Sequence, residues 1–299
     1  MHPVAPLTLS AVLAATVLLS GCGTQHGLSG GERTSGSPSC RPSPTAAGTT
    51  GTTGTTGTER DDVTLLGPGC GSVLANEFQV ANNGTEKLTY TIGFDVLNDS
   101  GHVMSNVRQT VAAVGPGQTV KATVEPDTSA PGGGAASRIR ISQVRAVPAG
   151  EAPSTAGACP PSGIHLSADE GDAAMGLRVV GLRLTNCGTG PYRLSGHPGL
   201  QLLDEKRTPV TGVRMLQGTE EISSGLEPAP APQAMTLQPG ESAHSSLAWR
   251  NTTGSGDPVN VPYVRVTAKP GAPAVTVTPE LDLGTTGRLG VGAWRKTTS

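Results

Sequence analysis

Five cysteines give this chain its most distinctive chemistry. A thiol can carry a lipid, join a second thiol or bind a metal ion, and the spacing of the thiols helps to separate these uses. No C-x-x-C pair or mixed Cys/His cluster occurs, and the six histidines are scattered along the chain. A structural zinc site is therefore the less favoured interpretation, and no metal or cofactor is expected. Acylation and disulfide formation remain as the expected chemistry of Cys22, Cys40, Cys70, Cys159 and Cys187.

The first cysteine follows an apolar segment, Leu7 to Leu19 (LTLSAVLAATVLL). This run is short for a permanent membrane helix and is typical of the central region of a signal peptide. Leu19-Ser20-Gly21-Cys22 then resembles the bacterial lipobox, in which the cysteine is acylated and becomes the new N-terminus. The resemblance implies a lipoprotein signal peptide over residues 1–21, a lipid on Cys22 and a place on the outer face of the cell membrane. The alternative is a plain secretory leader, but its A-x-A-like cleavage pattern is absent.

The four other cysteines are expected to form two disulfides. With Cys22 lipidated, they are an even set in a compartment that oxidises thiols. Four cysteines allow three connectivities. Proximity in the sequence favours Cys40 with Cys70 and Cys159 with Cys187, because each pair brackets one contiguous segment.

Residues 22–61 are predicted to be a disordered tether. They are rich in Gly, Ser, Thr and Pro, and Gly48 to Thr58 is a three-residue repeat (GTTGTTGTTGT). A segment with almost no apolar residues cannot bury enough surface to fold. We expect it to hold the following domains away from the membrane, and its threonines also allow O-mannosylation as an alternative role.

Residues 62–148 are predicted to form a β-domain. Its clearest strand is Lys87 to Leu97, where apolar residues alternate with polar or small ones. Turn-forming residues at Asn82–Gly84 and Asn98–Gly101 predict hairpins on both sides of it. Further strands are predicted at 73–80, 103–114, 118–124 and 138–147, with Gly115-Pro116-Gly117 as a turn. This order resembles the small immunoglobulin-like domains of bacterial exported proteins.

Residues 159–299 are predicted to form a second β-domain after a linker at 149–158. Its strands are expected at 177–185, 200–204, 210–216, 243–249, 263–268 and 274–278, and Ala243, Leu247 and Trp249 are expected to face inward. Aromatic residues are only 2% of the chain, whereas Gly 42 and Pro 25 supply many turns. The predicted fold class is all-β, with two immunoglobulin-like antiparallel sandwiches after a signal peptide and a disordered linker.

The second domain also carries a family resemblance. It rests on Met175–Val179, Leu184–Tyr192, Leu194–Pro198, Leu202–Asp204, Leu237–Ala243 and Trp249–Asn251. In this order they resemble the exported bacterial family known as domain of unknown function 4232, and the resemblance covers Cys159 to Trp294. Asn186 and Gly188 suit a turn at the end of a central strand, where Cys187 could be joined to Cys159.

No catalytic constellation is apparent in the sequence. G-x-S-x-G, H-E-x-x-H, P-loop and nucleotide-binding patterns are all missing. The acidic segment Asp169–Asp172 offers oxygen ligands for calcium, but its spacing lacks the EF-hand register, so a solvated loop is favoured. His165, His197 and His244 lie on different predicted segments, and none has an acidic residue or a cysteine at a spacing typical of a catalytic or metal site.

A non-catalytic binding or scaffolding role at the cell envelope is therefore expected. The formal net charge is -2, which does not favour nucleic acid as a partner. The expected partners are the membrane, through the lipid on Cys22, and another envelope protein or a wall polymer. The alternative is an extracytoplasmic enzyme of unrecognised type, which would require distant acidic residues and histidines to converge in one pocket.

Overall fold

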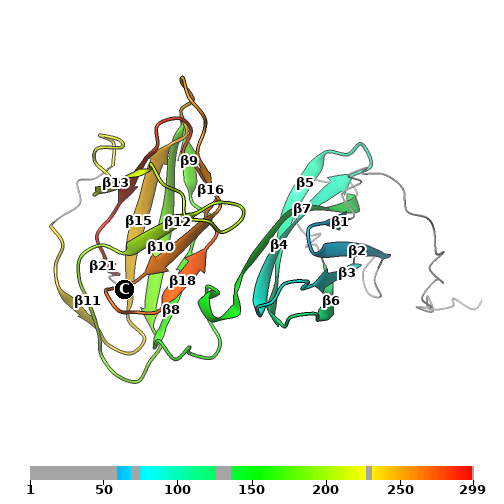
Figure 1. Cartoon of the computed structure of the whole chain (residues 1–299), viewed down its shortest axis with the longest axis horizontal. Helices are drawn as coiled ribbons and strands as arrows, with labels where there is room; N and C mark the ends of the chain where they lie inside the picture. Colours follow the sequence, from blue (N-terminus) through cyan, green and yellow to red (C-terminus); the bar gives the residue numbers. More distant parts are fainter. Residues whose placement is uncertain (1–58, 69–74, 126–135, 227–230, 298–299) are drawn as a thin grey trace, which may run out of the picture. The chain divides into compact units, whose positions relative to one another are not determined.

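A computed structural model of the chain describes residues 59–68, 75–125, 136–226 and 231–297 (Figure 1). The predicted signal peptide, residues 22–58 of the predicted tether, and Cys22, Cys40 and Cys70 lie outside the described residues. The predicted end of the tether at residue 61 is wrong, because Glu59 and Arg60 form a strand that pairs with the next one along the chain. The regular secondary structure of the described residues is β-strand, as predicted, apart from one short 3₁₀ turn. Their buried apolar side chains form two large clusters, one in each predicted β-domain. We refer to the two domains as the first and second sandwich.

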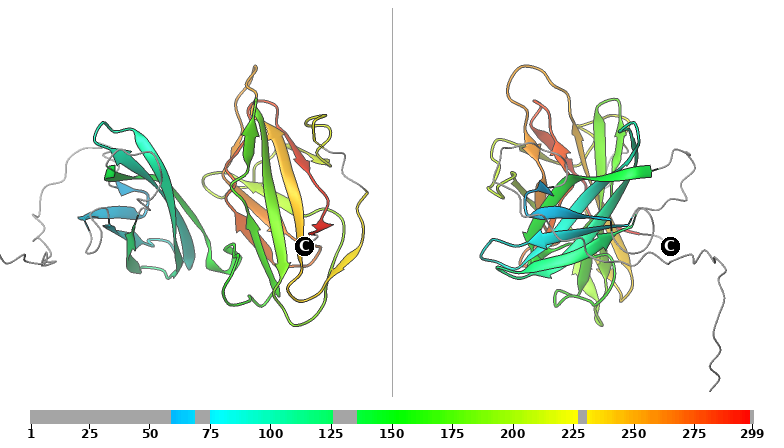
Figure 2. Two further views of the ribbon diagram at one scale, coloured as in Figure 1. Left: turned by 180° about the vertical axis from the view of Figure 1, so that it is seen from behind. Right: turned by 90° about the vertical axis from the view of Figure 1, so that its right-hand side faces the viewer.

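The first sandwich consists of two antiparallel sheets (Figures 1 and 2). One sheet has the order β1 (Glu59–Arg60), β2 (Val63–Pro68), β3 (Asn76–Ala81) and β6 (Thr119–Val124). The other has the order β5 (Val103–Val114), β4 (Leu88–Asn98) and β7 (Ala136–Pro148). Side chains from both sheets meet in one core, where the rings of Phe78 and Phe94 lie 5.1 Å apart.

The alternating pattern at Lys87–Leu97 correctly predicted β4. Its inward-facing residues, from Tyr90 to Phe94, are fully buried. The hairpin predicted at Asn98–Gly101 is also present, because β4 pairs with β5. The hairpin predicted at Asn82–Gly84 is wrong: β3 pairs with β2 and β6, so the chain passes there from one sheet to the other. The buried Asn82 side chain bonds the backbone of this corner, and turn-forming residues alone cannot distinguish a corner from a hairpin.

The predicted linker is held against the second sandwich. It begins with the 3₁₀ turn η1 (Ala149–Glu151), whose Glu151 carboxylate accepts hydrogen bonds from Arg265 and from the Thr276 hydroxyl. Ser154 Oγ lies 2.8 Å from His165 Nδ1 in the first strand of the second sandwich. The segment that precedes Cys159 therefore contributes fixed contacts as well as a connection.

The second sandwich is built around a sheet that we call the main sheet (Figures 1 and 2). Its order is β13 (Arg214–Gln217), β20 (Arg288–Val291), β15 (Ser242–Arg250), β10 (Leu177–Asn186) and β8 (Ile164–Ala168). The short strands β21 (Arg295–Lys296) and β9 (Asp172–Ala174) pair with β15 and β10. The pairing of β13 with β20 is parallel, whereas β8, β9, β10, β15, β20 and β21 pair in antiparallel fashion.

Smaller sheets complete the second sandwich. They are β12 (Gly199–Leu203) with β17 (Tyr263–Thr267) and β18 (Ala274–Val277), β11 (Tyr192–Leu194) with β14 (Met235–Leu237), and β16 (Asn260–Val261) with β19 (Leu281–Asp282). Ala243, Leu247 and Trp249 are buried between the main sheet and these strands, as predicted. Cys159 and Cys187 form a disulfide with their Cα atoms 5.5 Å apart, which confirms that predicted pairing.

Candidate functional site

The outer face of the main sheet, which points away from the core, carries a region of polar side chains. Along β15, Ala243, Leu247 and Trp249 point into the core, so Ser242, His244 and Ser246 point to the opposite face. On β10, Val180, Leu182 and Leu184 likewise point into the core. Arg183 and Thr185 therefore share the outer face with the polar side chains of β15.

Strand register brings three nitrogen-bearing side chains into one row on this face. Arg183 on β10 lies directly opposite His244 on β15, and His244 lies directly opposite Arg295 on β21. Directly opposed residues of antiparallel strands have Cβ atoms about 4.5–5.5 Å apart, so each arginine is an immediate neighbour of the imidazole. We call Arg183, His244 and Arg295 the cationic row.

A row of hydroxyl groups lies beside the cationic row. Thr185 Oγ1 and Ser242 Oγ are 2.8 Å apart, and Thr297 Oγ1 lies 3.4 Å from His244 Nδ1. On the outermost strand, His165 opposes Thr185 but is buried against Ser154. The hydroxyl row thus extends the polar face, while His165 is already engaged in a contact of its own.

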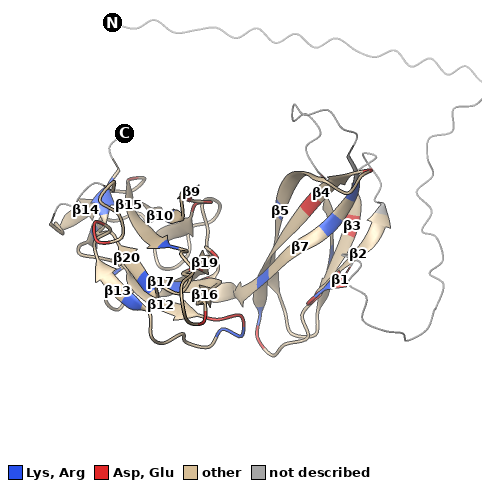
Figure 3. Cartoon of the chain, turned by 90° about the horizontal axis from the view of Figure 1, so that it is seen from above, with Lys and Arg blue, Asp and Glu red and all other residues tan. Residues whose placement is uncertain are grey.

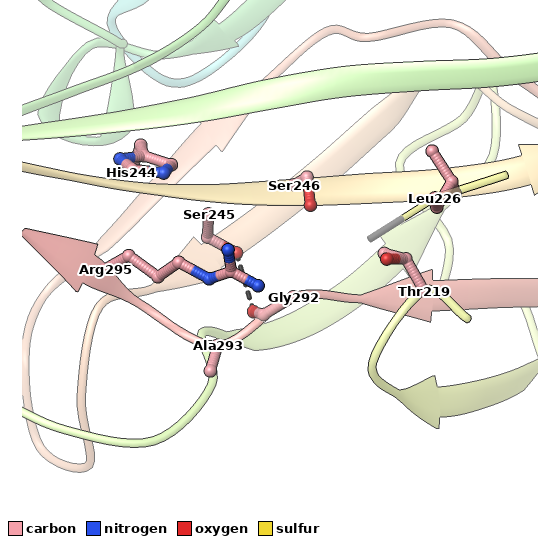
Figure 4. A pocket seen from close by; sticks show the side chains of 8 residues that line it. All are labelled: Thr219, Leu226, His244, Ser245, Ser246, Gly292, Ala293 and Arg295. Carbon is pink, nitrogen blue, oxygen red and sulfur yellow. Dashed lines mark hydrogen bonds between the residues drawn. The ribbon is translucent and has the colours of Figure 1, made fainter. Parts of the chain in front are cut away.

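A pocket of about 180 Å³ opens at one end of the cationic row (Figure 4). Beyond it, the outer face is covered, because Leu216 and Ile222 pack on Ala248 of β15. The pocket lies where this cover ends. Figure 4 shows Arg295 extending from its strand toward Gly292, with His244 and Ser246 on the neighbouring strand. The lining residues are Thr219, Leu226, His244, Ser245, Ser246, Gly292, Ala293 and Arg295.

Gly292 keeps the floor of the pocket open. Its N–H donates to Ser246 O at 2.8 Å, and its carbonyl accepts from Ser245 Oγ at 2.7 Å, so the connection between β20 and β21 lies close to β15 there. A Cβ atom at this position would lie 2.8 Å from Ser246 Oγ, closer than side chains tolerate. A glycine is therefore required if the Ser246 hydroxyl is to remain beside the pocket.

The pocket is electropositive. Arg183 and Arg295 form no ion pair within the described part of the chain, and no Asp or Glu is among the lining residues. Burial lowers the pKa of His244 below its ordinary value, and the positive charge of Arg295 lowers it further. Elsewhere on the two sandwiches acidic and basic residues are interspersed (Figure 3). The unpaired cations therefore suit an anionic ligand.

The strands that carry this site belong to one sheet of the second sandwich, which also contains the disulfide between Cys159 and Cys187. Residues 159–295 match the family model "Domain of unknown function (DUF4232)". The DUF4232 match agrees with the family resemblance noted for the second domain and includes the whole cationic row. No curated protein matches the chain. Among the described residues, no helix is both long and apolar enough to span a membrane.

The acidic segment considered for calcium has a local structural role in the DUF4232 region. Asp169 Oδ1 accepts hydrogen bonds from the N–H groups of Gly171 and Gly181, which fixes the turn between β8 and β9. Within the described ranges, no group of three or more His, Cys, Asp or Glu side chains is placed to hold a metal ion. The hydrogen bonds of Asp169 thus support the interpretation of this segment as a loop.

Only one of the three candidate histidines of the DUF4232 region lines the pocket. His244 does so, His165 is buried against Ser154, and His197 is half-buried outside it. Sequence reasoning named His244 but missed Arg183 and Arg295, because these residues stand on strands far apart in the sequence. Their only signal is the register of three strands, which is not visible before the sheet is known.

Proposed function

We propose that this chain is a lipid-anchored protein of the cell envelope with a non-catalytic binding role. In this proposal Cys22 carries the lipid, the chain between Cys22 and strand β1 is the tether, and two immunoglobulin-like sandwiches stand outside the membrane. The second sandwich binds its ligand at the pocket beside the cationic row. The partners are the membrane, through the lipid, and another envelope protein or a wall polymer.

Two observations support the extracytoplasmic location. The lipobox-like Leu19-Ser20-Gly21-Cys22 follows an apolar leader of signal-peptide length. Cys159 and Cys187 are joined as a disulfide, and structural disulfides are typical of oxidising compartments outside the cytoplasm.

The unpaired cations beside the pocket carry the proposal of a binding role. Arg183 and Arg295 have no ion-pair partners among the described residues, so both guanidinium groups are available to an anionic ligand. A catalytic His–Ser pair would need a third group that orients the imidazole. His244 instead has Thr297 Oγ1 at 3.4 Å and arginines on both sides. This arrangement suits recognition of charge better than proton transfer.

Retention of envelope components tests the binding role. The full chain, purified in detergent and immobilised, should retain a component of a detergent extract of the envelope. If that component is a wall polymer, it should still be retained after the extract has been treated with protease. The Arg183→Gln/Arg295→Gln double variant should lose this retention. Arg214→Gln is the matched control, because Arg214 is exposed on β13 of the same sandwich and lacks an ion-pair partner among the described residues. Equal retention by all three proteins would disprove binding at this pocket.

Replacement of Cys22 tests the anchor separately. Cys22→Ala should release the protein into the medium or leave an unprocessed precursor, whereas Cys40→Ala should stay with the membrane fraction. Unchanged membrane association and processing of Cys22→Ala would disprove acylation at this cysteine.

A further inference from the structure

We propose that the pocket beside the cationic row recognises a phosphate group. This inference rests on the proposed binding function and names the chemical class of its ligand. It depends on the donors that surround the pocket, on its size and on the two arginines that flank His244.

The size of the pocket favours a small charged group. Pockets for drug-sized ligands measure about 300–1,000 Å³. The hollow at His244 measures about 180 Å³, so it suits one compact group at the end of a larger molecule. Thr219 and Leu226 close one side of it, and Arg295 and His244 line another.

The donors around the pocket favour phosphate over carboxylate. A carboxylate has two oxygens in one plane and is satisfied by the fork of one arginine. The pocket offers the guanidinium of Arg295 and the imidazole of His244, and Arg183 lies next to His244 on β10, outside the lining residues. The hydroxyls of Ser246 and Thr219 have no hydrogen-bond partner in the described part of the chain. Donors from several directions match the three or four oxygens of a phosphate.

The position of His244 between two cations couples phosphate binding to a proton. The groups facing His244 are Arg183 from β10, Arg295 from β21 and Thr297 beyond it, whereas His165 of β8 is turned to Ser154 and Asp169 bonds backbone N–H groups. Without a ligand, burial and Arg295 disfavour the imidazolium. A bound dianion supplies the missing negative charge, so the imidazole should take up a proton and donate to it.

Titration of the His244 imidazole in the full chain tests this proposal. Inorganic phosphate should bind saturably in detergent solution and move the His244 ring resonances toward those of imidazolium at constant pH. Arg183→Gln and Arg295→Gln should each weaken binding about tenfold or more, since each removes a charge-assisted donor. Arg214→Gln should bind within about twofold of the unmodified chain, which is a change of under about 0.5 kcal/mol. His244→Gln should bind with less dependence on pH between 6 and 8, the range in which an ordinary imidazole loses its proton.

Two further arms identify the source of the phosphate group. Glycerol phosphate represents a soluble or polymer-borne ester, and phosphatidylglycerol vesicles, compared with phosphatidylcholine vesicles, represent a lipid headgroup. Competition by either probe with inorganic phosphate supports the proposal and names the source. Absence of a phosphate-dependent shift at His244, or a shift that survives both arginine substitutions, would overturn it. If the double variant nevertheless loses envelope retention, the binding function stands and only the phosphate assignment fails.

Discussion

Asn82 in the first sandwich and Asn186 in the second make the same set of hydrogen bonds. In each, Nδ2 donates to the carbonyl four residues ahead, at 2.8 Å for Asn82 and 2.9 Å for Asn186. Nδ2 also donates to a remote carbonyl, Val114 O or Leu237 O, at 2.8 Å. Oδ1 accepts from the N–H two residues ahead, at 2.9 Å and 3.0 Å. Both side chains are at most 1% exposed.

The turn that faces each asparagine is also repeated. Gly117 N donates to Asn82 O at 2.8 Å, and Gly240 N donates to Asn186 O at 2.7 Å. Each glycine follows a proline and adopts a positive φ, 68° in Gly117 and 85° in Gly240. The two sandwiches are therefore built around the same corner. It requires an asparagine, because one side chain must supply two donors and one acceptor there.

The first prediction concerns this corner. Asn82→Ala should lower the free energy of unfolding by about 2–4 kcal/mol, because it leaves buried backbone carbonyls without donors. Denaturant unfolding of the full chain, followed by circular dichroism, measures the change. Asn83→Ala is the neighbouring control, since Asn83 is exposed and makes one long contact of 3.4 Å to Asp62. Similar losses in the two variants would show that the corner does not depend on the Asn82 side chain.

The second prediction concerns the disulfide of the second sandwich. Cys159 and Cys187 are separated by 28 positions, and a cross-link over a loop of that length contributes about 3–4 kcal/mol in the chain-entropy model. Reduction should therefore lower the melting temperature by several degrees. Peptide mapping without reduction should recover the two cysteines in linked peptides. Linkage of Cys159 to Cys70, or two free thiols, would contradict the pairing.

The sequence was sufficient for the parts of the fold that have strong local patterns. Residues 88–96 of β4 alternate between apolar and polar or small side chains, because one buried face imposes a period of two. β5 was predicted at its observed limits, between the turn residues that flank it. The short strands β20 and β21 were missed. They have four and two residues, one includes a glycine, and their pairing partners define them more than their own residues do.

The candidate site could be predicted only in part. His244 was a candidate from the sequence, but its role could not be inferred without knowing which side chains surround it. Arg183 and Arg295 become its neighbours only through the registers of β10 with β15 and of β15 with β21. A shift of one residue in either register would turn the arginine to the opposite face. Side-chain chemistry of this kind depends on tertiary structure.

The third prediction concerns the pH dependence of stability. Burial acts to raise the pKa of Glu151, but hydrogen bonds from Arg265 and Thr276 outweigh it and hold this pKa below the ordinary value. A carboxylate with a lowered pKa in the folded chain stabilises that state above its unfolded pKa. The stabilisation is lost as the pH falls through the lowered folded pKa.

Glu151→Gln should therefore reduce stability by on the order of 1 kcal/mol at pH 7, because the partly exposed pair is screened by solvent. The difference from the unmodified chain should disappear at a pH below the folded pKa of Glu151. Thermal unfolding at a series of pH values measures both. Glu220→Gln is the control, as Glu220 is exposed and forms no ion pair within the described residues. A difference that is constant over the whole pH range would rule out a contribution from the Glu151 charge.

The fourth prediction concerns Gly292 at the floor of the pocket. Gly292→Ala would place a Cβ atom 2.8 Å from Ser246 Oγ, so either the serine hydroxyl or the backbone at residue 292 must shift. Phosphate affinity, measured through the His244 resonances, should fall by about tenfold or more although both arginines are retained. Thermal unfolding of the same sample shows whether the variant is folded.

Ser246→Ala distinguishes a clash with the Ser246 hydroxyl from a shift of the backbone as the effect of Gly292→Ala. Without Oγ the closest remaining contacts of the new Cβ are Ser246 N at 3.2 Å and Ser246 O at 3.4 Å, which require smaller adjustments. Gly292→Ala should therefore destabilise the chain less in the Ser246→Ala background than in the unmodified one, which gives a coupling in a double-mutant cycle. Additive effects on stability would show that the hydroxyl does not occupy the space beside Gly292. Unchanged phosphate affinity in Gly292→Ala would move the binding site away from this floor.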